Sequence, residues 1–115
     1  MLHYLKHIVI LIGFIESNPP QQVAAEGEDV TFECVVIRKS STSFTVEWTS
    51  DKSDVLIFSD ESNNTITLPL SLINVTNEDY QTYTCSGRDS DSNEIFVSAS
   101  VVLSKLTIAI LNIVS

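Results

Sequence analysis

The sequence predicts one all-β domain, a sandwich of short strands closed by a single disulfide. Apolar residues alternate with polar ones in four stretches, at residues 30–36, 44–48, 66–72 and 95–103. A period of two residues is typical of strands with one buried face. The only two cysteines are Cys34 and Cys85, the number expected for one structural disulfide in a small secreted chain. At 115 residues the chain has room for a single core.

Residues 1–17 have the pattern of a secretory signal peptide. Lys6 lies in the early part and an apolar run follows over residues 8–15. This run is too short to span a bilayer but has the length of a signal-peptide hydrophobic region. We expect the segment to be removed on secretion, with cleavage after Ser17; the alternative is an N-terminal strand or helix of the fold. Since His3 and His7 lie in this segment, the mature chain would contain no histidine.

The domain itself is expected over residues 18–103. Pro19 and Pro20 make an extended lead-in to an edge strand, because proline restricts its own backbone and that of the preceding residue. A turn at Gly27 then leads into the first alternating stretch. Strands are expected at residues 30–36, 44–48, 55–58, 66–72, 81–87 and 94–103. The inward face of the last strand is expected to carry Ile95, Val97, Ala99, Val101 and Leu103.

Five residues indicate how the two sheets meet. Tyr83 and Cys85 are two apart and share one face of a strand, while Trp48 and Cys34 supply a large ring and a second sulfur for the same core. A buried Tyr at this place can bond through its hydroxyl to the backbone just upstream, near Asp79. This constellation resembles the immunoglobulin superfamily. The resemblance implies a Greek-key immunoglobulin-like β-sandwich with one inter-sheet disulfide, against which the tryptophan packs.

The resemblance covers roughly residues 19–103. Leu70, Leu72 and Val75 match core positions of the family, whereas Gln81 stands where the family usually has Gly or Ala. Only 37 residues separate the tryptophan from the second cysteine, which is short for the variable type with its extra hairpin. No Gly-x-Gly bulge motif occurs in the last strand either. We therefore expect an intermediate or constant-like set.

The charge excludes some classes of partner. The formal net charge is −9, and no basic stripe is present to displace counterions from phosphates, so nucleic acid is not expected as a partner. An anionic membrane surface is disfavoured for the same reason. The acidic balance fits solubility in an extracellular setting.

Catalysis and metal binding find little support. With the cysteines in a disulfide and the histidines removed, no nucleophile and base pair is left, so we expect neither an enzyme nor a cofactor. Asp89, Asp91 and Asn93 alternate like the start of a calcium loop, but Glu94 and Ser100 stand where that loop needs Gly and a bidentate Glu. Aspartate and asparagine are also common in tight turns, so we expect a turn and no metal site.

Two glycosylation sequons suggest which surface is free for a partner. Asn63-Asn-Thr65 and Asn74-Val-Thr76 are both expected on or beside the sheet that contains the lead-in edge strand and the strands at residues 30–36 and 66–72. The opposite sheet carries no sequon, which makes its outer face the candidate partner surface; the alternative is a merely solvated face. Its outward residues are expected to be Thr45, Glu47, Thr82, Thr84 and Phe96, the last as an exposed aromatic anchor. Nearby, Arg38, Lys39, Arg88, Asp89 and Asp91 are expected to form a surface ion cluster.

The C-terminal residues 104–115 form a hydrophobic tail. The apolar residues 106–114 would rise about 14 Å as a helix, too little to span a bilayer. Three readings stay open: a membrane segment cut short, a weak lipid-anchor signal, or a plain extension.

The sequence thus predicts an extracellular protein-binding module, secreted or at the cell surface, that acts in recognition or adhesion. The alternatives are an accessory subunit of a membrane receptor complex and a calcium-dependent adhesion or lectin-like module. The partner's identity and the homo-oligomeric state are left open by these motifs.

Overall fold

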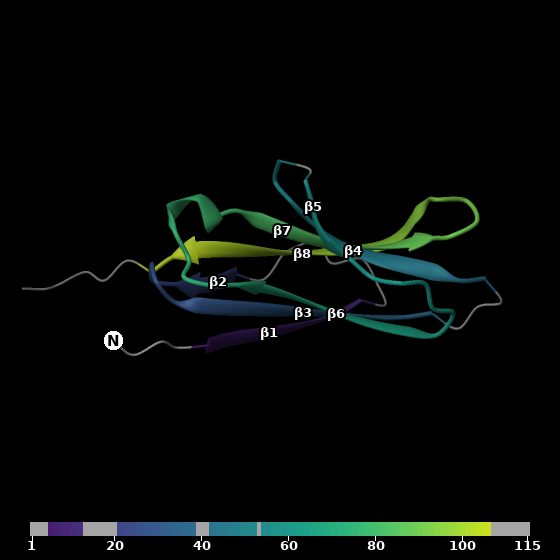
Figure 1. Ribbon diagram of the computed structural model, residues 1–115, viewed down its shortest axis with the longest axis horizontal. Coiled ribbons are helices and arrows are strands. Elements are labelled where there is room, and N and C mark those ends of the chain that lie inside the picture. Colours follow the sequence, from purple (N-terminus) through teal and green to yellow (C-terminus); the bar gives the residue numbers. More distant parts are fainter. Residues whose placement is uncertain (1–4, 13–20, 39–41, 53, 107–115) are drawn as a thin grey trace, which may run out of the picture.

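Two β-sheets face each other across one core in the computed structural model, which describes residues 5–12, 21–38, 42–52 and 54–106 (Figure 1). One sheet has the strand order β1-β3-β6 and the other β2-β8-β7-β4-β5. The elements are β1 (Leu5–Ile12), β2 (Gln21–Ala24), β3 (Asp29–Ile37), β4 (Phe44–Ser50), β5 (Val55–Phe58), β6 (Thr65–Leu72), the 3₁₀ turn η1 (Asn77–Asp79), β7 (Thr82–Asp89) and β8 (Ile95–Lys105). The predicted all-β sandwich is confirmed.

The apolar stretch expected to belong to a signal peptide contributes strand β1. It runs parallel to β3, from Leu5 opposite Asp29 to Ile12 opposite Val36, at the edge of the three-stranded sheet. Pairing in the unprocessed chain does not report on cleavage, so removal of residues 1–17 stays a prediction. If they are removed, β3 becomes an edge strand of its sheet.

The alternating stretches bury the residues that the period of two predicts. In β3 the inward positions from Val30 to Val36 are fully buried, while Ile37 beyond them is exposed. Pro69 in β6 lies on the exposed side, opposite Glu33, as expected for a residue without an N–H group. The remaining core comes from both sheets, namely Ala24, Phe44, Val46, Trp48, Ile66, Leu68, Leu70, Val75, Tyr83, Cys85, Val97, Ala99, Val101 and Leu103.

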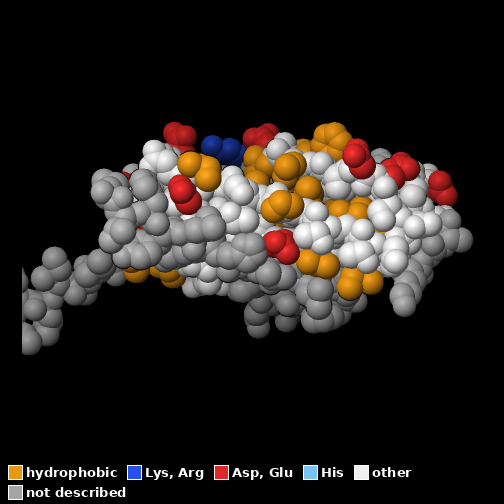
Figure 2. Space-filling model, turned by 60° about the horizontal axis from the view of Figure 1, so that its bottom comes forward, with side chains coloured by type: hydrophobic (Ala, Val, Ile, Leu, Met, Phe, Trp, Pro, Cys, Tyr) orange, Lys and Arg blue, Asp and Glu red, His pale blue; other side chains and the backbone are white. Residues whose placement is uncertain are grey.

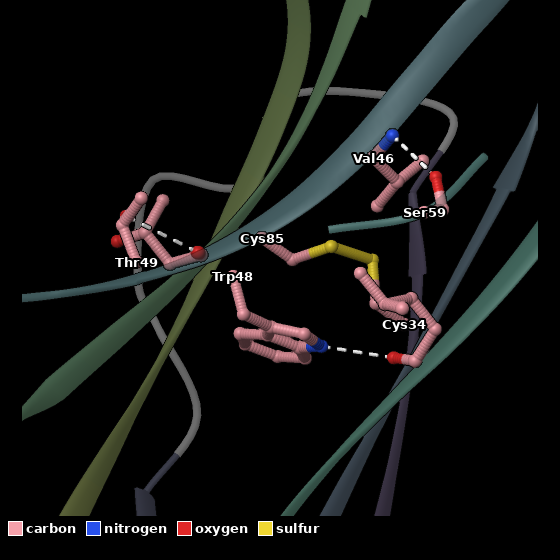
Figure 3. The surroundings of a disulfide bond; sticks show 8 residues. Cys34, Val46, Trp48, Thr49, Ser59 and Cys85 are labelled. Carbon is pink, nitrogen blue, oxygen red and sulfur yellow. Dashed lines mark hydrogen bonds between the residues drawn. A yellow bond between two sulfur atoms is a disulfide. The ribbon is translucent and has the colours of Figure 1, made fainter. Parts of the chain in front are cut away.

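The disulfide joins the two sheets at the centre of this core. Cys34 on β3 and Cys85 on β7 are bonded and fully buried, and their Cα atoms are 6.5 Å apart. The ring of Trp48 lies beside the disulfide, and its Nε1 donates a 2.8 Å hydrogen bond to the carbonyl of Leu68 (Figure 3). This bond crosses from one sheet to the other, so the indole satisfies its only polar group without leaving the core.

The corner before β7 is closed by Tyr83. Its hydroxyl donates a 2.6 Å hydrogen bond to the carbonyl of Asp79, the contact expected for a tyrosine corner. Asp79 in turn accepts a 2.7 Å bond from the backbone N–H of Thr76, which holds η1 in place. Burial raises the pKa of the Tyr83 hydroxyl above its ordinary value, because the charged phenolate would be desolvated.

Strand β8 differs from the prediction at its start. Gly87 pairs with Val97 but the next residue, Arg88, pairs with Ile95, so Phe96 is an extra residue in a β-bulge. The bulge reverses the expected directions: Ile95 is 51% exposed, and Phe96 is half-buried against the core. The expectations of an inward Ile95 and an outward Phe96 are therefore wrong.

Candidate partner-binding face

The outer face of the five-stranded sheet carries four of the predicted partner-face residues together. Thr45 and Glu47 on β4 and Thr82 and Thr84 on β7 all alternate with buried residues and are partly exposed. In the ladder between these strands, Glu47 lies opposite Ser86. Whether this face meets a partner stays a prediction.

Several polar groups of the face have partners within it. Thr84 and Ser100 join their hydroxyls at 2.8 Å, and Arg88 Nη2 donates a 3.0 Å hydrogen bond to Glu47 Oε1. The Arg88–Glu47 ion pair is partly exposed, so its contribution to stability is small, about 0–1 kcal/mol. These bonds fix side-chain directions in advance and lower the entropy cost of a later contact.

A shallow hollow of about 620 Å³ runs across this face. Thr84, Ser86 and Ser98 contribute to its polar lining, and Val55 and Ile95 are its apolar members. Both apolar side chains are about half exposed. The hollow therefore offers hydrogen-bonding groups together with apolar contacts from two different edges of the face.

Strand β5 supplies apolar surface that the predicted face did not include. Val55, Leu56, Ile57 and Phe58 are all exposed, and Phe58 is 71% exposed. They stay exposed because β5 lies at the end of its sheet and, among the described strands, pairs only with β4. The sequence carried a signal for this, since four consecutive apolar residues in a short strand cannot all face one core.

The end of the sandwich near the β7–β8 turn is held by a stacked cluster. The guanidinium of Arg38 lies 4.1 Å from the centroid of the Phe96 ring, and that ring meets Phe44 edge to face at 5.6 Å. Arg38 Nη1 also donates a 2.8 Å hydrogen bond to Asp89. Phe96 therefore acts within the fold as a platform for Arg38, and it is not an exposed anchor.

Asp89 is the acceptor that closes the β7–β8 turn. Its Oδ2 receives hydrogen bonds from the backbone N–H groups of Asp91 and Ser92 and from the Ser92 hydroxyl, and its Oδ1 receives one from Thr42 besides that from Arg38. The bond from the Ser92 backbone, followed by that from Arg38, holds the pKa of the Asp89 carboxyl well below its usual range. Both oxygens are thus engaged with donors, as in an aspartate-capped turn. In the described part of the chain, no three His, Cys, Asp or Glu side chains form a group that could hold a metal ion.

The predicted ion cluster is only partly assembled. Arg38 pairs with Asp89, whereas Arg88 turns to Glu47 on the sheet face. Lys39 lies outside the described residues. The cluster therefore splits into two pairs, one that ties loops together and one that lies across the face.

Both sequon asparagines are exposed. Asn74 follows β6 with φ of 55°, a left-handed conformation that asparagine tolerates, and its backbone N–H bonds to Asp29. Asn63 precedes β6 and follows Ser62, which pairs with Phe44 of β4. Asn74 is thus near the three-stranded sheet, as expected, while Asn63 lies at the rim between the two sheets. Glycosylation of both stays a prediction.

Carboxylates are scattered along the rim of the molecule (Figure 2). Figure 2 shows carboxylates along the upper rim and at the right-hand end of the molecule, beside a small basic area and scattered hydrophobic side chains. No helix among the described residues is long and apolar enough to cross a membrane. The residues of the predicted hydrophobic tail beyond Leu106 lie outside the described residues.

Comparison with known proteins places the chain in a family. The model of the immunoglobulin domain family matches residues 14–88, about two thirds of the chain. The chain belongs to this immunoglobulin domain family. No curated protein matches its sequence.

Solved structures share the fold of this immunoglobulin domain at low sequence identity. The NK cell receptor NKp44, described as a triggering partner in natural cytotoxicity, is 17% identical, with a TM-score of 0.61 over 76% of this chain and 100% of its own. The extracellular domain of mouse leukocyte-associated immunoglobulin-like receptor 1, solved as a strand-swapped dimer, is 15% identical, with a TM-score of 0.55 over 87% of this chain and 94% of its own. Both likenesses show the fold alone, and the set within the family stays a prediction.

Proposed function

We propose that this immunoglobulin domain is an extracellular recognition module that binds another protein through the outer face of β8, β7, β4 and β5. The observation that carries the proposal is the hollow with a polar lining between Val55 and Ile95. Protein interfaces combine exposed apolar anchors with a polar surround whose groups are already oriented. The receptor names of the two structural neighbours support a role in cell-surface recognition.

The geometry favours direct protein binding over a calcium-dependent adhesion or lectin-like module. That alternative required Asp89 to offer its oxygens to a cation, and these oxygens accept hydrogen bonds from the turn and from Arg38. A face that combines apolar side chains with polar groups is typical of surfaces that bind proteins.

The chain direction agrees with presentation at a cell surface. Strand β8 ends at the left of Figure 1, whereas the β7–β8 turn lies at the right. A tether formed by the C-terminal tail would therefore begin at the end opposite this turn. The outer face would lie along the side of such a tethered domain.

The test compares two exposed isoleucines, one at the start of β8 and one that follows β6 of the other sheet. A soluble tagged domain is screened against a library of cell-surface proteins, and the hit is measured with Ile95→Asp and with the matched control Ile73→Asp, which lies just after β6. We expect Ile95→Asp to weaken binding about tenfold or more and the control to bind as the unaltered domain does. Equal loss in both variants, or loss in the control alone, would show that the face is wrongly assigned.

Secretion and modification are tested on the protein released from cells. Mass spectrometry should find an N-terminus at Asn18 and a mass that falls on enzymatic removal of N-linked glycans from Asn63 and Asn74. A released protein that still begins at Met1 contradicts the predicted signal peptide.

A further inference from the structure

A second shallow hollow, here called the corner hollow, lies where the β2–β3 turn meets the connection from β6 to η1. It measures about 590 Å³, within the range of about 300–1,000 Å³ that small-ligand sites have. Its lining comes from both segments, namely Glu26, Gly27, Asn74, Val75, Thr76, Asn77 and Glu78. Since Asn74 is the acceptor of the second predicted sequon, a glycan on this asparagine would be rooted in the hollow itself.

The two walls of the corner hollow are bonded to each other. The Gly27 N–H donates a 2.8 Å hydrogen bond to the Val75 carbonyl, and the Val75 N–H donates a 2.9 Å bond back to the same turn. Lys105 Nζ also donates to Glu26 Oε1 at 3.3 Å and to Asn77 Oδ1 at 3.2 Å. A site whose walls are already fixed loses little entropy when a ligand fills it.

The backbone of Asn74 is fixed as well. Its φ is 55°, and its N–H donates a 2.9 Å hydrogen bond to Asp29 Oδ1. The next residue, Val75, is buried and bonded through both of its backbone groups. Asn74 itself is exposed, as attachment of a glycan requires. The starting point of the glycan is therefore held in one place.

Gly27 leaves room beside the Asn74 amide. It has a φ of 89° and no side chain. Among the described residues other than its chain neighbours, a Cβ at Gly27 would have only Asn74 Oδ1 within 4 Å, at a distance of 3.7 Å. The Asn74 amide therefore lies next to open space over the glycine backbone. The glycine that the left-handed turn requires also supplies a flat surface for a ring.

We propose that the first N-acetylglucosamine of a glycan on Asn74 binds in the corner hollow and connects the β2–β3 turn to η1. The inference rests on the predicted use of this sequon in the secreted chain. Because the sugar is joined to Asn74 Nδ2, its ring begins beside the space over Gly27. Its acetamido N–H and its hydroxyl groups are donors, and the lining carboxylates of Glu26 and Glu78 accept hydrogen bonds. The outer side of the ring stays in water, where the rest of the glycan continues.

The other sequon supplies an internal control. Asn63 precedes β6 and Asn74 follows it, so the two asparagines lie at opposite ends of this eight-residue strand. The strand spans roughly 26 Å. A glycan on Asn63 has the same general effects on solubility, but it is rooted too far away to connect the β2–β3 turn to η1.

The test measures hydrogen exchange of the Gly27 and Val75 N–H groups in the secreted, disulfide-bonded chain. An Asn63→Gln chain, which carries only the Asn74 glycan, is compared in three forms: intact, trimmed to the first sugar, and stripped of all sugar. We expect both N–H groups to exchange about threefold to tenfold more slowly in the first two forms than in the third, because the bound sugar adds contacts that must break before the corner opens. In an Asn74→Gln chain, which carries only the Asn63 glycan, trimming and stripping should leave this exchange unchanged.

A second sugar-free form controls for charge, because enzymatic stripping turns the glycosylated asparagine into aspartate. Thr76→Val destroys the sequon and leaves Asn74 as it is. It keeps the backbone N–H that donates to Asp79 and loses the longer 3.3 Å bond of the Thr76 hydroxyl. Exchange at Gly27 and Val75 should be as fast in this variant as in the stripped chain.

A direct contact is measured by NMR on the trimmed form. We expect nuclear Overhauser effects from the protons of the sugar to the Hα protons of Gly27. None of the residues of the corner hollow lines the hollow of the outer face, so all three forms should bind a protein partner equally. The assignment of the partner face is therefore decided separately, by Ile95→Asp.

Four results would overturn the bound sugar. The first is a secreted chain that carries no glycan on Asn74, and the second is equal exchange in the intact, trimmed and stripped forms. The third is slow exchange in Thr76→Val, which would assign the effect of stripping to the new carboxylate. The fourth is a trimmed form without any contact between the sugar and Gly27.

Discussion

Replacing Tyr83 with Phe removes one hydroxyl from the corner that joins η1 to β7 and leaves the ring in place. The ring is 1% exposed and packs against Phe32 at 5.6 Å, contacts that Phe keeps. The hydroxyl gives up its 2.6 Å bond to the Asp79 carbonyl. It also loses the longer 3.4 Å bond that Gln81 Nε2 donates to it. The substitution therefore removes the polar contacts of the hydroxyl and keeps the packing of the ring.

The expected cost follows from the surroundings of that bond. A buried neutral hydrogen bond contributes about 1 kcal/mol net, and an acceptor left without a partner adds to the loss where water cannot reach it. Asp79 itself is partly exposed, so water can replace part of the bond to its carbonyl. We expect Tyr83→Phe to lower the free energy of unfolding by about 1–2 kcal/mol, and the melting temperature by about 4–8 °C for each kcal/mol.

Denaturant unfolding followed by Trp48 fluorescence measures this change, with Tyr80→Phe for comparison. Tyr80 donates a 2.9 Å bond to the Ala24 carbonyl of edge strand β2 from a less buried position. Tyr80→Phe should lower the free energy of unfolding by less, about 0.5–1 kcal/mol. A Tyr83→Phe domain as stable as the unaltered one, or less affected than the Tyr80 variant, would refute the role given to the corner.

Alkaline unfolding gives an independent readout of Tyr83. Burial raises its folded pKa above the unfolded value of about 10. Its contribution to stability is therefore complete below pH 10 and is lost as the pH rises through the folded pKa. Tyr83→Phe should flatten the loss of stability above pH 10; an unchanged alkaline limb would contradict a buried, protonated hydroxyl.

Three other predictions concern the disulfide and the β7–β8 end. Replacing both Cys34 and Cys85 with Ala should lower the free energy of unfolding by about 4 kcal/mol from loop entropy alone, since the disulfide joins residues that are 51 apart in the sequence. An unchanged denaturant unfolding curve would contradict this. Asp89→Asn should reduce the loss of stability that the domain shows at acid pH. The pKa of Asp89 is lower in the folded state than its unfolded value of about 3.9, so the carboxylate stabilises the fold above that pH and this contribution is lost as the pH falls below it. An equal loss in both chains would contradict it. Gly87→Ala should cost about 1–3 kcal/mol in thermal unfolding, because a Cβ there would lie 2.8 Å from the Phe96 ring, whereas a tolerated alanine would show that the ring moves freely.

Strand positions and the central core could be predicted because they depend on local rules. Alternation in residues 30–36 specifies one inward face wherever the strand is placed, and burial follows that face in β3. The spacing of Tyr83 and Cys85 gives both residues the same direction, so the corner and the disulfide were visible in the sequence.

The candidate face was predicted less well, because it depends on pairing between distant strands. Alternation assigned Phe96 outward and Ile95 inward, and one extra residue opposite Gly87 reversed both. Nothing local in the last strand marks that residue, since the bulge is set by how Phe96 packs on Phe44 and under Arg38. A slip of one residue exchanges the two faces of a strand.

The sequence by itself thus predicted a β-sandwich, its disulfide and its buried tyrosine corner, because these follow from periodicity and from a few spacings along the chain. The same residues carry the resemblance to the immunoglobulin superfamily. Only the tertiary structure decided which apolar residues remain at the surface. Strand β5 is as apolar as any core strand, yet its side chains are exposed because β5 has a single neighbour among the strands that the structure describes. A residue's hydrophobicity is local, whereas the presence of a strand beside it depends on the whole fold.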